Sequence, residues 1–210
     1  MVITLGYDDG MMSLHKLICI CFEQSTKVLI LPEKQMKKLK NSELNRLSVD
    51  EFKEKKKLPI LVVLDNIRSL NNIGSVFRTS DAFLIEKIYL CGITARPPHK
   101  DIHKTALGST ESVDWEYCEN ISKLIIKLKQ DKFFIWSVEQ ADKSKKLTSF
   151  SLDKDLKHAL IFGNEVKGVS EAAINLSDEV IEIPQYGTKH SLNISVCSGI
   201  LIWEFFKRLS

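Results

Sequence analysis

The feature that most constrains the fold is an alternation of short apolar runs with helix-like segments, which begins at residue 58. The run LPILVVLD (58–65) is typical of a buried strand, and the spacing of Ile73, Val76 and Phe77 after it is typical of a helix. Strands are expected near 59–64, 86–91, 112–117, 132–138, 157–162 and 179–183. Helices are expected near 72–84, 99–107, 120–130, 170–176 and 191–208. This order predicts an α/β fold, with a mostly parallel sheet and helices on both faces.

The residues before this alternation have a different character. Residues 1–35 show no clear pattern, whereas Met36 opens a basic stretch that favours helix. Two interpretations stay open: translation starts at Met36, or residues 1–35 form a small element that docks on the domain. We therefore predict an N-terminal extension over 1–57 and a single domain over 58–210.

The basic stretch over residues 34–57 holds nine Lys or Arg and four Asp or Glu. A basic segment can contact phosphate, although most charge runs are solvated faces. A helix is expected over 42–56, with Asn41 or Ser42 as its N-cap. Its loose apolar face would consist of Leu44, Leu47 and Phe52.

Composition excludes several classes of protein. With 44% hydrophobic and 27% charged residues, the 210-residue chain is typical of a soluble globular protein. The five scattered cysteines include no CxxC pair, which argues against a disulfide framework or a zinc site and favours reduced thiols in the cytoplasm. No apolar run approaches the ~20 residues of a membrane span, and the first residues lack a basic n-region.

Three stretches at expected strand ends are rich in glycine and polar residues. They are NIRSLNNIGSVFRTSDAF (66–83), ALIFGNEVKGVS (159–170) and IEIPQYGTKHSLNIS (181–195). Ligands of open parallel sheets bind beyond the carboxyl ends of the strands, so these stretches predict one shared cleft. Gly163 and Gly168 have the spacing of a phosphate loop, but no Lys-Ser/Thr pair follows, and no GxGxxG occurs. An ATPase and a Rossmann dehydrogenase are therefore disfavoured.

The second and third stretches contain particular candidates for binding. Gly163 would let the backbone approach a flat ligand, and Glu165 follows that turn. Ser191 is expected to cap the last helix, with Asn193 just inside it. Free N–H groups at such a helix start favour an anion. A role in capping or turn formation alone is the alternative for both side chains.

Other candidates are weaker. His99 and His103 are four residues apart, but no further ligand has suitable spacing, so we expect no metal site and interpret them as solvated or RNA-facing. His190 precedes Ser191, yet no GxSxG elbow surrounds that serine. The tryptophans are expected in the core: Trp115, Trp136 and Trp203.

Together the stretches resemble the SpoU (TrmH) family of SPOUT-class RNA ribose 2′-O-methyltransferases. The matching motifs are Asn72-x-Gly74-x-x-x-Arg78, Phe162-Gly163-x-Glu165-x-x-Gly168, and Ile183-Pro184 followed by Ser191-Leu192-Asn193-x-Ser195. They occur in the family's order, and the resemblance covers roughly 58–206. The segment SVEQADKS (137–144) also resembles the link before the second motif.

The resemblance implies a C-terminal deep trefoil knot, an exception to the rule against knots. It also implies a homodimer formed through the last helix, which is apolar on nearly every face. The implied cofactor is S-adenosyl-L-methionine. By the resemblance it would be held by Gly163, Ile183, Leu192 and Val138. The reaction site would be lined by Asn72, Arg78, Glu165, Ser191 and Asn193.

The implied activity is methyl transfer to a ribose 2′-OH of structured RNA. We favour tRNA over rRNA because the chain is compact. The alternative is a knotted RNA-binding or assembly factor without catalytic activity, which the intact motif residues disfavour. Arg78 could serve as the general base or as a phosphate clamp, and the reluctance of a guanidinium to release its proton favours the clamp.

Overall fold

The computed structural model describes residues 36–210, so the predictions for residues 1–35 lie outside the described part of the chain. Contacts divide the chain into Met1–Arg46 and a compact unit over Leu47–Ser210. The strands of this unit are β1 (Leu58–Asp65), β2 (Ile85–Cys91), β3 (Trp115–Cys118), β4 (Phe133–Val138), β5 (Lys145–Lys146), β6 (Lys157–Phe162) and β7 (Glu179–Glu182). Its helices are α1 (Val49–Glu54), α2 (Leu70–Ala82), α3 (Lys100–Ala106), α4 (Ser109–Ser112), α5 (Ile121–Gln130), α6 (Glu171–Leu176) and α7 (Ile194–Leu209).

The sheet has seven strands in the order β3-β2-β1-β6-β4-β7-β5, and every strand pair is parallel. The predicted α/β class with a parallel sheet is therefore confirmed. Five of the six predicted strands lie within one residue of their expected bounds. The strand expected over 112–117 begins only at Trp115, because α4 extends to Ser112; α4 and β5 were not predicted. The trefoil knot stays a prediction. Within residues 36–210, no helix is long and apolar enough to cross a bilayer.

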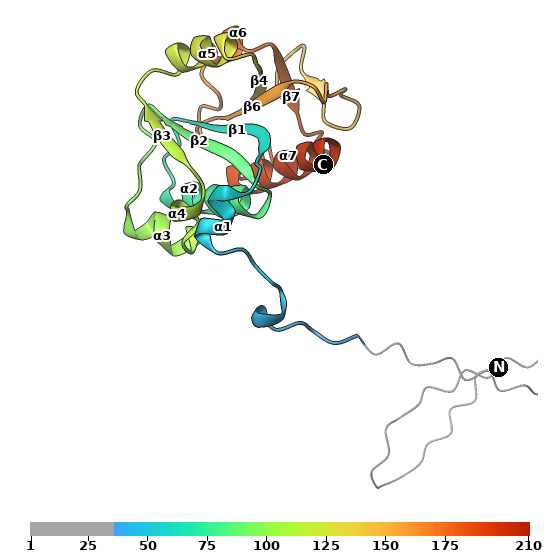
Figure 1. Ribbon diagram of the computed structural model, residues 1–210. Helices are drawn as coiled ribbons and strands as arrows, with labels where there is room; N and C mark the ends of the chain where they lie inside the picture. The colour runs from blue at the N-terminus through green and yellow to red at the C-terminus, as the bar shows by residue number, and fades with distance from the viewer. Residues whose placement is uncertain (1–35) are drawn as a thin grey trace, which may run out of the picture. The chain divides into compact units, whose positions relative to one another are not determined.

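Helices cover both faces of the sheet (Figure 1). Strand β1 is buried on both sides, and its alternate side chains enter different layers. Ile60, Val62 and Leu64 pack in the layer that contains α2 and α7. Leu61 and Val63 pack in the layer that contains α5 and α6. Two-sided burial is the reason that this strand is apolar at every position from Leu58 to Leu64.

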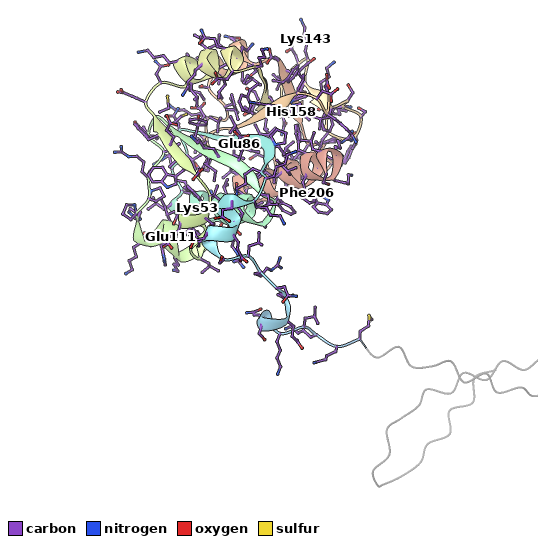
Figure 2. All side chains as sticks on the ribbon, in the orientation of Figure 1. Lys53, Glu86, Glu111, Lys143, His158 and Phe206 are labelled. Carbon is purple, nitrogen blue, oxygen red and sulfur yellow. The ribbon has the colours of Figure 1, made fainter. Side chains whose placement is uncertain are left out.

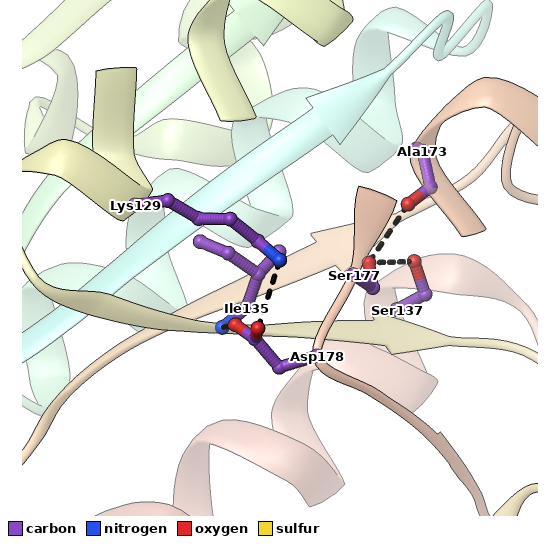
Figure 3. A network of polar contacts seen from close by, with 6 residues as sticks. All are labelled: Lys129, Ile135, Ser137, Ala173, Ser177 and Asp178. Carbon is purple, nitrogen blue, oxygen red and sulfur yellow. Dashed lines mark hydrogen bonds and ion pairs between the residues drawn. The ribbon is translucent and has the colours of Figure 1, made fainter. Parts of the chain in front are cut away.

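A polar network fixes the amino end of β7 against β4 (Figure 3). The carboxylate of Asp178 accepts a hydrogen bond from the Ile135 N–H at 2.8 Å and pairs with Lys129 Nζ at 2.8 Å. The hydroxyls of Ser137 and Ser177 lie 2.7 Å apart, and Ser177 also donates to the Ala173 carbonyl. These contacts fix where β7 starts, and so they fix the position of its carboxyl end.

The helix predicted over 42–56 is wrong as a single element. A short 3-10 helix covers Asn41–Glu43, and α1 begins separately at Val49. The N-cap of α1 is Ser48, whose hydroxyl accepts from the Glu51 N–H while the Glu51 carboxylate accepts from the Ser48 N–H. This reciprocal capping box outweighs the helix propensity of the residues before it. Of the three residues in the predicted apolar face, only Phe52 is buried; Leu44 and Leu47 are exposed.

The last helix also differs from its prediction at its start. Asn193, not Ser191, is the N-cap of α7, because the Asn193 Oδ1 accepts from the Ser195 N–H at 2.8 Å. One face of α7 is buried through Leu201 and Phe205, while Trp203 on another face is 50% exposed. Of the three tryptophans expected in the core, Trp136 is buried and Trp115 partly buried.

A buried histidine predicts how stability depends on pH. His158 lies on β6 (Figure 2) and is 1% exposed, and its ring packs against that of Phe205 on α7. Its Nδ1 accepts from the Trp136 indole N–H at 3.2 Å, so the proton lies on Nε2, which faces the Asp153 carbonyl at 2.9 Å. Burial lowers the pKa of His158, and the contact with Asp153 only partly offsets this. The native state therefore holds a neutral imidazole.

We expect the free energy of unfolding to fall as the pH drops below about 6.5, because the unfolded chain then binds a proton that the native site resists. The largest slope for one group is about 1.4 kcal/mol per pH unit. Urea denaturation at pH 7.5, 6.0 and 5.0 measures this. The His158→Gln variant is the control, and it should lack this part of the slope. Equal slopes for both proteins would contradict the assignment.

Candidate active site

The main cavity, of about 550 Å³, lies at the carboxyl ends of β4, β6 and β7. Strand register brings these ends together, because Val138 pairs with both Phe162 and Ile181. All four residues predicted to hold the cofactor line this cavity: Val138, Gly163, Ile183 and Leu192. Three of the predicted reaction-site residues also line it: Glu165, Ser191 and Asn193. The prediction that polar strand ends share one cleft is thus confirmed for the second and third stretches.

The loop after β6 forms one wall of the cavity. Asn164 and Gly168 exchange backbone hydrogen bonds of 2.9 and 2.8 Å, and the Asn164 side chain accepts from the Val166 and Lys167 N–H groups. A Cβ on Gly163 would lie 2.0 Å from the Val169 nitrogen. Glycine is therefore required at this position by the fold of the loop itself.

Glu165 connects this loop to the start of α2. Its carboxylate accepts hydrogen bonds from the Arg68 N–H at 3.1 Å, the Ser69 N–H at 3.0 Å and the Asn72 side-chain amide at 3.1 Å. Desolvation alone would raise the pKa of Glu165, but these hydrogen bonds outweigh it and lower the pKa. The carboxylate stays ionised near neutral pH and its oxygens are already occupied. Glu165 is therefore suited to positioning α2 rather than to accepting a proton.

A chain of side-chain contacts joins the three motifs. Asn72 donates to Glu165, and its carbonyl oxygen accepts from the Asn193 amide at 3.3 Å. The Asn193 oxygen is held in turn by the Ser195 N–H and hydroxyl, at 2.8 and 2.6 Å. The two amides are therefore fixed against each other, with Asn193 on the cavity wall and Asn72 next to it.

Arg78 and Ser191 lack such support. Ser191 lines the cavity and is exposed. Arg78 is also exposed, six residues after Asn72 on α2, and it does not line the cavity. Within residues 36–210 its guanidinium forms no hydrogen bond or ion pair with another side chain. The structure brings together every predicted reaction-site residue except Arg78.

Sequence reasoning assigned no role to Glu139 and Gln140, which line the cavity beyond β4. The Glu139 carboxylate accepts from the Val169 N–H at 3.0 Å, and Gln140 donates to the His190 carbonyl at 2.8 Å. Their segment, SVEQADKS, was matched to the family only as a link. Cys197 also lines the cavity, but burial and the charge of Glu139 raise its pKa to about 12, so the thiol is a poor nucleophile.

This geometry agrees with a comparison to known families. The sequence profile of the SpoU rRNA methylase family matches residues 59–203, which contain all three motifs. The chain belongs to this family. Membership confirms the predicted family and the predicted enzyme class, an RNA methyltransferase.

Curated relatives carry related descriptions. A tRNA/rRNA methyltransferase of Borreliella burgdorferi, described as uncharacterized, is 33% identical over 77% of this chain and 69% of its own length. The tRNA (guanosine(18)-2′-O)-methyltransferase of Aquifex aeolicus is 30% identical over 82% of this chain and 75% of its own. A TrmH family relative from Staphylococcus aureus is 28% identical, and the chain spans 62% of its length.

Solved structures agree with the fold. The A. aeolicus TrmH/SpoU tRNA modifying enzyme superposes with a TM-score of 0.67 at 27% identity, over 77% of this chain and 81% of that one. The AdoMet-bound rRNA methyltransferase of Sinorhizobium meliloti gives a TM-score of 0.68 at 23% identity, over 76% and 60% of the two chains. The second likeness concerns the fold alone.

Proposed function

We propose that the chain transfers a methyl group from S-adenosyl-L-methionine to a ribose 2′-OH of RNA. The observation that carries this proposal is the contact chain from Glu165 through Asn72 to Asn193, at the mouth of a cavity of about 550 Å³. Those three residues come from the three motifs of an RNA methyltransferase family. The two amides would receive the ribose, while the cavity would hold the cofactor.

The cavity suits this cofactor in size and in lining. Its volume falls within the range of about 300–1,000 Å³ that is usual for small-molecule sites. Val138, Ile183 and Leu192 supply apolar walls for a base, and Glu139 supplies a carboxylate near which a cationic group is favoured. When bound, the cofactor supplies an electrophilic methyl on a sulfonium. A solved structure with the same fold, that of the S. meliloti enzyme, is described as AdoMet-bound.

The side chains of the site would act mainly by alignment. Asn72 and Asn193 can hydrogen-bond a ribose hydroxyl or an adjacent phosphate without reading the base. Glu165 would keep the start of α2, and hence Asn72, at a fixed distance from the cavity. Ser191 would add a hydroxyl at the cavity wall. Correct alignment of two reactants supplies a large part of the rate in such transfers.

For the RNA we propose tRNA before rRNA. The A. aeolicus relative, 30% identical, is named for a tRNA guanosine 2′-O position. Other relatives are described for tRNA and rRNA together. The alternative function, an RNA-binding factor without catalysis, is disfavoured by the Asn72–Asn193 contact, since a pure binding protein needs no such alignment at a cofactor-sized cavity.

The proposal is tested by incubating the purified protein with methyl-labelled cofactor and separate tRNA and rRNA fractions. We expect label in the tRNA fraction, and mass spectrometry of digested nucleosides should locate it on ribose. Calorimetry measures cofactor binding independently. Label on a base would exclude ribose methylation, and cofactor binding or RNA binding without transfer would favour the alternative.

We also propose a homodimer formed through α7. Three apolar side chains on this helix are exposed at spacings of four and three residues: Val196 at 51%, Ile200 at 36% and Trp203 at 50%. Trp203 stacks on Phe206, and both rings contact Phe83, the residue directly after α2. A contiguous apolar surface of this kind marks an interface more often than a solvated face. The first turn of α7, which carries Val196, also lines the cavity through Ile194 and Cys197, so the interface would border the active site.

Replacing Trp203 by Asp should weaken the dimer about 30-fold or more, because interface tryptophans are frequent hot spots and a buried carboxylate is costly. Sedimentation equilibrium over a range of concentrations measures the change. Ile126→Asp is the matched control: Ile126 is also 50% exposed, but it lies on α5 at the other face of the sheet. A Trp203→Asp protein that dimerises like the control would refute the interface.

A further inference from the structure

A second cavity, of about 460 Å³, lies away from the candidate active site. It is bounded by the segment before α3, by α3 and α4, and by the start of β3, which is the edge strand farthest from β7 and β5. Its lining residues are Pro97, Pro98, His99, Lys100, Ile102, His103, Thr110, Glu111 and Trp115. None of them belongs to the three family motifs or to the main cavity.

The lining combines a flat aromatic wall with hydrogen-bonding groups. Trp115 is partly buried, and it lines the cavity together with the rigid ring of Pro98. The Nδ1 of His99 accepts from the Asp101 N–H at 3.2 Å, which leaves Nε2–H as a free donor. Aromatic rings beside cationic donors are the usual components of sites for unstacked nucleotides.

The charges around this cavity are unpaired. Among residues 36–210, neither Lys100 nor Lys104 of α3 takes part in an ion pair, and Glu111 on the cavity wall takes part in none either. Arg96 lies over the Tyr117 ring at 4.5 Å, beside the segment that leads into the cavity. Cations without partners on one surface favour a phosphate backbone over a neutral ligand. His99 and His103 belong to no described group of three or more metal-binding side chains, which disfavours a metal.

Helix α3, which lines the second cavity, packs against the start of α2, which carries Asn72 of the reaction site. The Thr105 hydroxyl donates to the Asn71 carbonyl at 2.9 Å, and Asn71 directly precedes Asn72. A Cβ on Gly74 would lie 2.2 Å from the Ile102 carbonyl oxygen, so α2 and α3 touch backbone to backbone at the first motif. An RNA strand whose target ribose lies at Asn72 could therefore continue across α3.

We propose that this second cavity binds one unstacked nucleotide of the RNA substrate, outside the target nucleotide. The base stacks on Trp115, and a neighbouring phosphate pairs with Lys100 and His103. This inference rests on the proposed function, because it takes RNA as the substrate. It adds a specific anchor that selects where along the RNA the target ribose is placed.

Glu111 gives the site a preference among bases. Its carboxylate accepts hydrogen bonds from an exocyclic amino group, such as N4 of cytosine, and it repels the carbonyl oxygen found at the same position in uracil. Cytosine and uracil have similar size and stacking surface. A difference in affinity between them therefore reports the effect of the Glu111 carboxylate.

The test uses fluorescein-labelled hexacytidylate and hexauridylate, titrated with the full chain and followed by anisotropy. Trp115→Ala should weaken hexacytidylate binding about 10-fold, a typical loss for one stacked base. Trp115→Phe should retain most of the affinity. Glu111→Ala should remove the preference for hexacytidylate over hexauridylate. Lys100→Ala should lower the salt slope by about 0.7, the value for one phosphate contact of a single strand.

Lys127→Ala on α5 is the control for charge, since it removes a lysine from the other face of the sheet. Unchanged affinity in both Trp115→Ala and Lys100→Ala would overturn the proposal, as would equal losses in Lys100→Ala and Lys127→Ala. If Trp115→Ala fails to fold, the Glu111→Ala and Lys100→Ala variants still decide.

The outcome is separable from that of the proposed function. The oligonucleotide assay contains no cofactor and measures no methyl transfer. If the unaltered protein methylates tRNA but its oligonucleotide affinity does not depend on Trp115, only the second site is refuted. If Trp115 and Glu111 govern oligonucleotide binding but no RNA is methylated, the second site stands and the proposed catalysis does not.

Discussion

Replacing Arg78 by Ala is expected to slow methyl transfer at least about 100-fold, the loss typical of removing a charge-stabilising or positioning group. Arg78 is exposed on the helix that carries Asn72, and in the described part of the chain its guanidinium has no partner. It is therefore free to bind an RNA phosphate through forked donors. Cofactor affinity should be nearly unchanged, because Arg78 does not line the cavity. Single-turnover transfer and calorimetry measure the two quantities.

Arg78→Lys separates the two roles that remain open for this residue. A guanidinium rarely releases its proton, whereas the ammonium group of lysine does so more readily. If Arg78 is the general base, the lysine variant should recover part of the rate and accelerate with pH. If Arg78 clamps phosphate and ribose, the variant should stay slow at every pH, and this is the result we expect. A transfer rate of the Arg78→Lys variant that rises with pH at saturating RNA would refute the clamp hypothesis.

The second large effect is expected at Gly163. A Cβ there would lie 2.0 Å from the Val169 nitrogen and 2.1 Å from the Gly168 carbonyl carbon, and both atoms are backbone. Gly163→Val must therefore displace the loop that carries Glu165. We expect a loss of cofactor affinity of at least about 10-fold and a loss of stability of about 1–3 kcal/mol, as for other overpacked sites.

Gly187→Ala is the matched control, since a Cβ on Gly187 meets nothing within 4 Å. We expect this variant to have nearly the cofactor affinity and the free energy of unfolding of the unaltered protein, as measured by calorimetry and urea denaturation. Full cofactor affinity in Gly163→Val would show that the loop adapts, and that its conformation does not limit binding.

Much of the fold could be predicted because local pattern and burial agree in most elements. Strand β1 is apolar at successive positions because it is buried on both faces, and such a run is easily identified. The prediction of a helix over 42–56 failed because a capping box at Ser48 and Glu51 begins a short helix at Val49, whereas propensity alone favoured a longer one. Strand β5 has two residues, both lysine and both exposed, so no hydrophobic pattern indicates it.

The site was predicted unevenly for a similar reason. Gly163, Ile183 and Leu192 follow strand ends, and the parallel register carries such residues to one edge of the sheet. The cap of α7 was misplaced by two residues because Ser191 and Asn193 have nearly equal N-cap preference, and only the contact with Ser195 distinguishes them. Glu139 was missed because its hydrogen bond to Val169 joins residues 30 apart in sequence.

The contact between Glu165 and the start of α2 also determines when this site can exist during synthesis. The Arg68 and Glu165 partners are 97 residues apart in sequence, and β1 pairs with β6 across a similar interval. A nascent chain that has emerged only through α5 contains Asn72 but not Glu165, the residue that holds it. Contacts of such long range form late in folding. An incomplete polypeptide thus has no assembled reaction site with which to engage RNA near the ribosome.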